Sequence, residues 1–223
     1  MKRYSIFGAG NYLSDIFDIV HANDGKVVEI CHNAPDADPG RSITIKQRID
    51  LLDYEVRYFR SLDEFVPIEG CEYIMSLARP SSKNKLVTII KNRFNINFCQ
   101  LIHPKAHIGS NVHIGEGVII APGVVVAPNA QIGDFSIINR MASIGHESTI
   151  GKYSNVGPAA TIAGSSNIGD SCIISMGASI VDQVNVGKSS IIGAGAVVTK
   201  DLPDKVVALG IPAKVVRKNE DSS

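Results

Sequence analysis

The residues best suited to chemistry are a histidine and a glutamate that are adjacent in the second half of the chain, His146 and Glu147. An imidazole titrates near neutral pH, and a neighbouring carboxylate can orient it or raise its basicity, so this pair suits general-base catalysis on an amine or a hydroxyl. Adjacent side chains on a straight strand point to opposite faces. The two groups can therefore cooperate only where the chain turns a corner.

A second histidine group lies earlier in the chain, at His103, His107 and His113. Histidine is a common zinc ligand, and these three are close enough in sequence to suggest a metal site. Their spacings are four and six residues, and no pair has four residues between its members. We therefore expect solvated histidines and no bound metal.

A glycine-rich segment near the start, Gly8-Ala9-Gly10-Asn11-Tyr12-Leu13, follows a strand-like run. Backbone N–H groups at such a turn, with a helix N-terminus behind them, favour a phosphate. Leu13 replaces the third glycine of the dinucleotide fingerprint, which disfavours NAD. A shorter ligand such as a nucleotide-sugar pyrophosphate and a purely structural turn both remain open. Asn33, just beyond the next predicted strand, is placed for a base or ribose contact.

The elements that would hold this turn form a small α/β unit. Apolar patterning predicts a βαβ start that resembles a Rossmann unit, followed by a third strand and a second helix. The predicted segments are strands at 4–7, 26–31 and 72–77, helices at 12–21, 61–66 and 81–93, and a polar, turn-rich stretch at 36–48.

The elements that would hold His146 come from an internal repeat. Ile or Val occupies every sixth position from Ile108 to Val198 without a miss. A six-residue period fits neither a helix nor a simple strand, but it fits a short strand plus a tight corner, three of which close a triangular coil. We expect the aliphatic residue to point inward, the small residue two positions earlier to lie near the corner, and the glycine that usually follows to adopt the turn dihedrals. Stacked coils then share one continuous core.

The repeat has no inserted residue between Ile102 and Val198, so no long loop should project from the prism. A cleft must then be formed by another subunit or by the N-terminal domain. Eleven of the thirteen Phe and Tyr residues fall before residue 102, which places a change of architecture there.

Composition excludes several classes of protein. The 223 residues carry 22 Lys plus Arg against 22 Asp plus Glu, which gives no broad basic face for nucleic acid. No apolar run is long enough to span a membrane. Free thiols in a reducing cytoplasm are expected for the four widely spaced cysteines, which are Cys31, Cys71, Cys99 and Cys172.

The hexads resemble the left-handed parallel β-helix of the hexapeptide-repeat family. Residues 139–151, the downstream Ala163-Gly164 and the closing 210–214 segment are similar to sugar O-/N-acetyltransferases of the sialic acid O-acetyltransferase (NeuD) and bacillosamine-pathway (PglD) type. The resemblance implies an α/β nucleotide-sugar-binding-like domain at 1–101, a left-handed parallel β-helix acetyltransferase domain at 102–200 and a C-terminal extension at 201–223.

The resemblance also implies residue roles. His146 becomes the proton acceptor, Glu147 raises its basicity, and a backbone N–H near Ala163-Gly164 holds the oxyanion. The implied acetyl-CoA contacts are Asn155, which replaces a histidine of close relatives, with Gly164, Met176 and Ala194. The implied substrate contacts are Gly8, Ala9, Gly10, Asn11, Asn33, Ala78 and Asn139.

The function implied is acetyl transfer from acetyl-CoA to an amino group of a nucleotide-linked amino sugar, for surface polysaccharide or glycan biosynthesis, in a cytoplasmic homotrimer with active sites between subunits. Sugar O-acetylation, a non-catalytic solenoid scaffold and a zinc hydratase of the same fold are the alternatives. The basic residues Lys214, Arg217 and Lys218 either meet the CoA 3′-phosphate or form a solvated tail.

Overall fold

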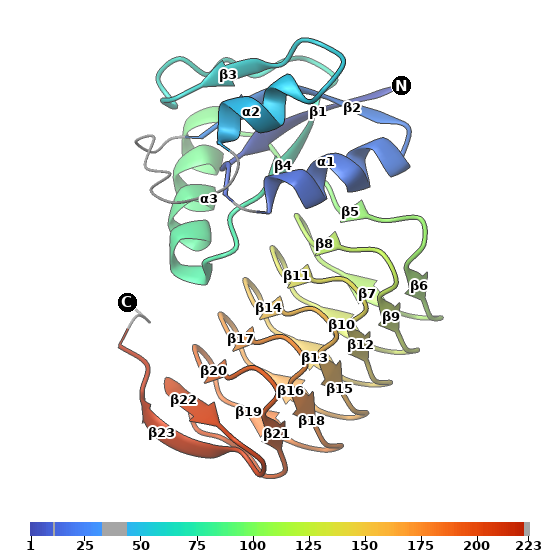
Figure 1. Ribbon diagram of the computed structural model, residues 1–223, viewed down its shortest axis with the longest axis vertical. Helices are drawn as coiled ribbons and strands as arrows, with labels where there is room; N and C mark the ends of the chain where they lie inside the picture. The colour runs from blue at the N-terminus through green and yellow to red at the C-terminus, as the bar shows by residue number, and fades with distance from the viewer. Residues whose placement is uncertain (11, 33–43, 221–223) are drawn as a thin grey trace.

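The computed structural model describes residues 1–10, 12–32 and 44–220, so the predictions for Asn11 and Asn33 lie outside the described residues. An α/β domain sits on one end of a long prism of short strands, and a strand pair formed by residues 206–218 lies at the other end (Figure 1).

The N-terminal domain is a parallel sheet with strand order β3-β2-β1-β4. One apolar cluster joins α1 to Tyr4 and Ile6 of β1, while a second joins α3 to Phe7 of the same strand. Because successive strand residues face opposite sides, the two helices cover opposite faces of the sheet. The bounds are β1 Lys2–Phe7, α1 Leu13–Ala22, β2 Gly25–Cys31, α2 Ile45–Asp50, β3 Arg57–Phe59, β4 Glu72–Met75 and α3 Pro80–Phe94.

Three local predictions for this domain need correction. The turn-rich stretch predicted up to Arg48 ends in α2, which begins with a capping box: the Thr44 hydroxyl accepts from the Gln47 N–H at 3.2 Å, and the Gln47 side chain accepts from the Thr44 N–H at 2.9 Å. The predicted helix at 61–66 is a set of turns, in which Ser61 Oγ accepts from the Asp63 N–H. Strand β3 was not predicted.

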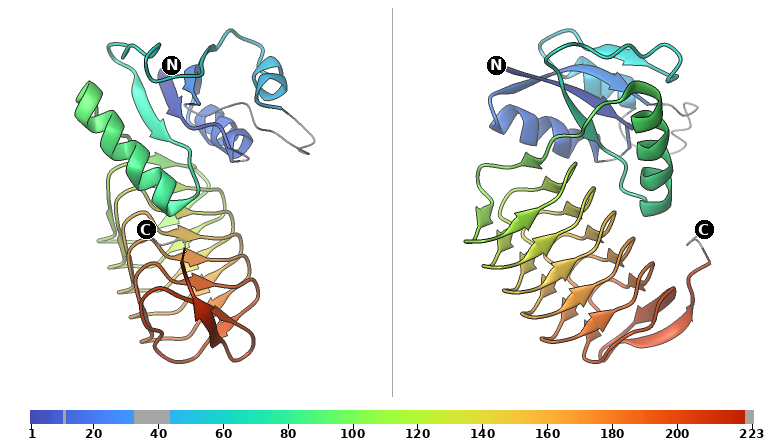
Figure 2. Two further views of the ribbon diagram at one scale, coloured as in Figure 1. Left: turned by 90° about the vertical axis from the view of Figure 1, so that its left-hand side faces the viewer. Right: turned by 180° about the vertical axis from the view of Figure 1, so that it is seen from behind.

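The prism consists of two-residue strands that recur every six residues, and each strand that begins between residues 101 and 179 pairs in parallel with the strand eighteen residues later. They form three sheets, which we call the β8, β9 and β10 sheets after a member of each (Figures 1 and 2). The bounds are β5 Leu101–Ile102, β6 His107–Ile108, β7 His113–Ile114, β8 Ile119–Ile120, β9 Val125–Val126, β10 Gln131–Ile132, β11 Ile137–Ile138, β12 Ser143–Ile144, β13 Thr149–Ile150, β14 Asn155–Val156, β15 Thr161–Ile162, β16 Asn167–Ile168, β17 Ile173–Ile174, β18 Ser179–Ile180, β19 Asn185–Val186, β20 Ile191–Ile192 and β21 Val197–Val198. An antiparallel pair, β22 Val206–Leu209 and β23 Lys214–Lys218, closes the β8 sheet.

The prism core follows the predicted pattern. Aliphatic residues such as Ile144 and Ile162 are fully buried in one continuous cluster. The small residue two positions before each aliphatic is often a buried serine whose hydroxyl is satisfied by the next coil: Ser148 Oγ donates to the Ala163 carbonyl at 2.9 Å and accepts from the Ser166 N–H at 3.2 Å. The polar groups inside the prism thus form hydrogen bonds that connect one coil to the next.

The expected reason for the glycines was wrong. The left-handed backbone conformation falls three residues after each aliphatic from Ile108 to Ile192, as at Glu147 with φ of 59° and Ala159 with φ of 54°. The glycine directly after the aliphatic meets the next coil instead, since a Cβ on Gly145 would lie 2.5 Å from the Ala163 carbonyl carbon. These glycines permit close stacking of coils rather than turn dihedrals.

The two domains share apolar contacts. Ile119 and Ile137, outward residues of the β8 sheet, join the α1 cluster. Phe135 joins the α3 cluster, with its ring 5.3 Å from Phe98 and stacked on Tyr153. Figure 2 shows α3 running down beside the first coils.

Among the described residues, every helix is too short or too polar to cross a bilayer. All four cysteines are free thiols.

Candidate active site

The prism has three corners with different surroundings. The His146 corner (residues 127–129, 145–147, 163–165 and 181–183) joins the β9 and β10 sheets. The Phe135 corner (133–135, 151–153, 169–171 and 187–189) joins the β10 and β8 sheets. The Met176 corner (139–141, 157–159, 175–177 and 193–195) joins the β8 and β9 sheets.

The corner geometry brings His146 and Glu147 together. Glu147 occupies the left-handed position, and its Oε2 lies 3.5 Å from Nδ1 of His146. Both side chains are open to solvent, at 64% and 60% exposure. A carboxylate at Nδ1 favours the tautomer with the proton on that nitrogen, which leaves the Nε2 lone pair to accept a proton.

The imidazole of His146 packs against the backbone of the next coil. A Cβ on Gly164 would lie 2.5 Å from Nε2 of His146 and 2.6 Å from Cε1, so the ring rests on this glycine. The neighbouring Ser165 donates its hydroxyl to Glu147 Oε2 at 3.3 Å. Gly164, predicted to contact acetyl-CoA, therefore lies at Nε2 of His146.

The two amides considered for an oxyanion site differ in their partners. The Ala163 N–H donates to the Ile180 carbonyl at 2.9 Å and is therefore occupied. The Gly164 N–H has no backbone acceptor among the described residues. Of the two, Gly164 is the one with a donor to offer.

Asn155, another predicted acetyl-CoA contact, lies elsewhere. It is an outward residue of the β8 sheet, where its amide Nδ2 donates to the Ala78 carbonyl and its Oδ1 accepts from Lys83 Nζ at 3.0 Å. Asn155 and Ala78, predicted for two different ligands, are thus bonded to one another at the domain junction.

Lys83 was missed by the sequence analysis. Its side chain is 1% exposed, and Nζ also donates to the Phe135 carbonyl at 2.7 Å. Burial lowers the pKa of Lys83 from 10.5 to about 7. A signal was present, because Lys83 stands with Leu86, Val87 and Ile90 in the apolar stripe of α3.

The remaining predicted prism contacts share the Met176 corner. Met176 is 62% exposed, and Ala194 is the equivalent residue one coil further. Asn139 lies at the same corner and accepts from the Arg140 N–H at 2.8 Å. Arg140 pairs with Asp15 of α1 at 2.7 Å, which ties this corner to the helix that follows the glycine-rich turn. Within one chain, these residues and His146 lie at different corners.

The glycine-rich turn is partly structural. Gly8 has φ of 87°, and a Cβ there would lie 2.7 Å from the Leu77 side chain. Ala9 is buried. Gly10 differs, because a Cβ there would meet no atom within 4 Å. Only Gly10 of these three leaves open space for a ligand.

The first-coil histidines are not all solvated as predicted. His107 and His113 are exposed, but His103 is buried, and its Nδ1 accepts from the Lys105 N–H at 3.0 Å. His103 directly follows β5, whose Ile102 carbonyl accepts from Asn23 of the N-terminal domain at 3.0 Å, so it lies where the two domains meet and is covered there. Within the described ranges, no group of three His, Cys, Asp or Glu residues is arranged to hold a metal ion.

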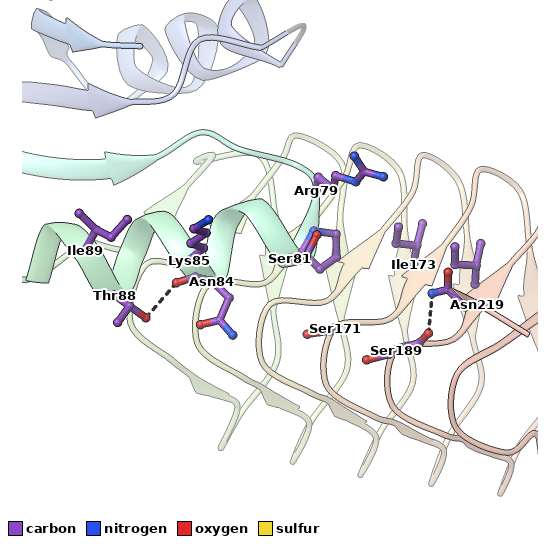
Figure 3. Close-up of a pocket in the computed structure, with 12 residues that line it drawn as sticks. Arg79, Ser81, Asn84, Lys85, Thr88, Ile89, Ser171, Ile173, Ser189 and Asn219 are labelled. Carbon is purple, nitrogen blue, oxygen red and sulfur yellow. Dashed lines mark hydrogen bonds between the residues drawn. The ribbon is translucent and has the colours of Figure 1, made fainter. Parts of the chain in front are cut away.

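A groove of about 650 Å³ runs between α3 and the β8 sheet (Figure 3). Its floor includes Ile173 and Ile191, and α3 contributes Ser81 and Asn84. His146 and Glu147 do not line it, so the groove and the exposed pair are separate features of one chain.

Comparison with known proteins agrees with this architecture. Residues 101–128 match the bacterial transferase hexapeptide (six repeats) family. The chain has the left-handed parallel β-helix fold of hexapeptide-repeat sugar acetyltransferases, with an N-terminal α/β unit, which confirms the predicted fold class and resemblance. No curated protein matches the chain.

Two groups of solved structures are similar over nearly the whole chain. PerB from Caulobacter crescentus, in complex with CoA and GDP-perosamine, is 29% identical with a TM-score of 0.80, and the match covers 96% of this chain and 97% of that one. The acetyltransferase domain of PglB from Neisseria gonorrhoeae, in complex with acetyl coenzyme A, is 22% identical with a TM-score of 0.81, covering 96% and 99%. The second likeness concerns the fold alone.

Proposed function

We propose that this protein transfers an acetyl group from acetyl-CoA to an amino group of a nucleotide-linked amino sugar. The observation that carries the proposal is the open His146–Glu147 pair at a prism corner, with Nε2 resting on Gly164. The similarity to a perosamine N-acetyltransferase from Caulobacter crescentus bound to CoA and GDP-perosamine, at 28% identity over 96% of both chains, supports the chemical class. Two solved forms of that enzyme replace a single histidine, by Asn or by Ala.

The chemistry follows from the pair. As the acceptor nitrogen attacks the thioester carbonyl, a C–N bond forms and the C–S bond breaks. His146 Nε2 takes the proton that the nitrogen loses, and Glu147 stabilises the resulting imidazolium. The departing CoA thiolate takes up the proton that the imidazolium releases, which returns His146 to its neutral form. The Gly164 N–H is the donor available to the carbonyl oxygen while it carries negative charge.

The separation of the predicted contacts supports a homotrimer. Gly164 lies at the His146 corner, whereas Met176 and Ala194 lie at another corner of the same prism. One acetyl-CoA could meet both sets where the His146 corner of one copy faces the Met176 corner of a second. Met176 and Met141 are 62% and 67% exposed, as expected for side chains that a second copy covers.

The first test follows CoA release with a thiol reagent. The protein is given acetyl-CoA with UDP-, dTDP- and GDP-linked amino sugars, and with free and CMP-linked sialic acids. We expect turnover with at least one amino sugar and a product that gains one acetyl group by mass spectrometry. Light scattering on the same sample should give the mass of a trimer.

The acceptor atom is decided by treating the product with alkaline hydroxylamine, which cleaves acetyl esters and leaves acetamides intact. A stable product supports N-acetylation, whereas a labile product shows the alternative, sugar O-acetylation. Absence of both acetyl-CoA binding and turnover across the panel would contradict the proposal and favour the scaffold. We also propose that the protein acts in the cytoplasm, where acetyl-CoA and nucleotide sugars are supplied.

A further inference from the structure

The exposed carboxylate of Glu147 needs a restraint to act on His146. A side chain that is 60% exposed can adopt several rotamers, and only some of them place Oε2 near Nδ1 of the imidazole. Fixing the side chain in one rotamer costs conformational entropy. The contact with His146, at 3.5 Å, is too long for a strong hydrogen bond and does not offset that cost alone. Another group must hold the carboxylate.

Ser165 makes that contact from the following coil. Its Oγ donates at 3.3 Å to Oε2, the same carboxylate oxygen that faces His146. The backbone of Ser165 is itself fixed, because its N–H donates to the His146 carbonyl at 2.8 Å and its φ of 55° is the left-handed value of the corner. One residue thus contacts both members of the pair, His146 through its backbone and Glu147 through its hydroxyl.

We propose that Ser165 is a positioning residue for the acetyl transfer: it holds the Glu147 carboxylate at Nδ1 of His146. This inference rests on the proposed function. On the later coils, the charged residues at positions equivalent to His146 and Glu147 are Asp182, Lys200 and Asp201. Among the described residues none of them has a bond to Glu147, and Asp201 accepts from Asn185 instead.

The chain offers matched variants for a test. Alanine is compatible with the corner backbone, since Ala159 has φ of 54° at the equivalent position, so Ser165→Ala should fold normally. Asn111→Ala is the control: Asn111 also has the left-handed conformation and donates from its side chain across one coil, to Asn129 Oδ1, at the same 3.3 Å. Ser165→Asn is the rescue variant, because Asn129 adopts this conformation with φ of 62° and an amide can donate to Glu147.

Steady-state CoA release is measured for these variants with the accepted amino sugar. For Ser165→Ala we expect kcat to fall about fivefold, the loss of one hydrogen bond to a charged group at an exposed site, with KM unchanged. Ser165→Asn should recover most of kcat, and Asn111→Ala should match the wild type. In a Glu147→Ala background, Ser165→Ala should cost nothing more, because the hydroxyl acts through the carboxylate.

The outcomes separate this inference from the proposed function. An active wild type with equal kcat in Ser165→Ala, or a Ser165→Ala loss that persists in the Glu147→Ala background, overturns the role of Ser165 alone. A wild type without turnover on any acceptor overturns both.

Discussion

The His146 corner and the Phe135 corner have the same backbone conformation but opposite surroundings: one is open to solvent and the other is buried. Glu147 and Phe135 both occupy the left-handed position, with φ of 59° and 58°. Phe135 is 3% exposed and packs between Phe98 and Tyr153, where it anchors the N-terminal domain. Glu147 is open to solvent beside His146. The repeat therefore supplies equivalent positions, and the side chain placed there decides between packing against the N-terminal domain and an open polar site.

This difference predicts that variants at the two corners differ in their effect on stability. Phe135→Ala should lower the free energy of unfolding by about 3–5 kcal/mol, as for other buried Phe truncations. Gln183→Ala, at the same turn position on the His146 corner, should change it by less than about 0.5 kcal/mol. Urea denaturation measures both. Equal losses would contradict the assignment of docking to the Phe135 corner.

The junction beside Phe135 should also depend on pH. The pKa of Lys83 is about 7 in the folded protein, against 10.5 for an ordinary lysine. Between these values the unfolded chain binds more protons, so this residue makes the free energy of unfolding rise with pH from about 7 to 10.5. Lys83→Met should remove that rise, whereas the exposed Lys85→Met should keep it. Denaturation at pH 6.5, 8 and 9.5 gives the slope, and an unchanged slope in Lys83→Met would refute this origin.

A smaller effect is expected from Gly164→Ala at the His146 corner. The added Cβ would lie 2.5 Å from His146 Nε2, and the exposed ring can move away without disturbing the coil. We expect kcat to fall roughly tenfold, about 1.4 kcal/mol in the barrier, with little change in Tm. Gly177→Ala, which meets no atom within 4 Å but has φ of 63°, shows how far left-handed backbone strain alone lowers Tm. A large fall in Tm would show that Gly164 serves coil stacking instead.

The prism was predictable because its contacts are local in the repeat. An inward Ile or Val at every sixth position, from Ile108 to Val198, fixes strand, corner and partner coil together. The elements of the N-terminal domain were less predictable, since β3 is only three residues long and its pairing with β2 depends on distant contacts. The capping box at Thr44 and Gln47 was a readable signal for α2 that propensity alone did not reveal.

For the candidate site, adjacency in sequence allowed prediction of the His146–Glu147 pair, whereas contacts across coils and domains were missed. Ser165 reaches Glu147 because coils repeat every eighteen residues. The Lys83–Asn155 contact joins α3 to the prism over a sequence separation of 72 residues, and no local pattern specifies that packing.

The exposed pair at the His146 corner is proposed to perform the proton transfer. The most direct test compares kcat/KM of the wild type and His146→Ala for acetyl transfer to the accepted amino sugar. We expect kcat/KM to fall roughly 10²–10⁴-fold, the usual contribution of a general base, with an unchanged denaturation midpoint. Activity of the folded variant within a few fold of the wild type would contradict it.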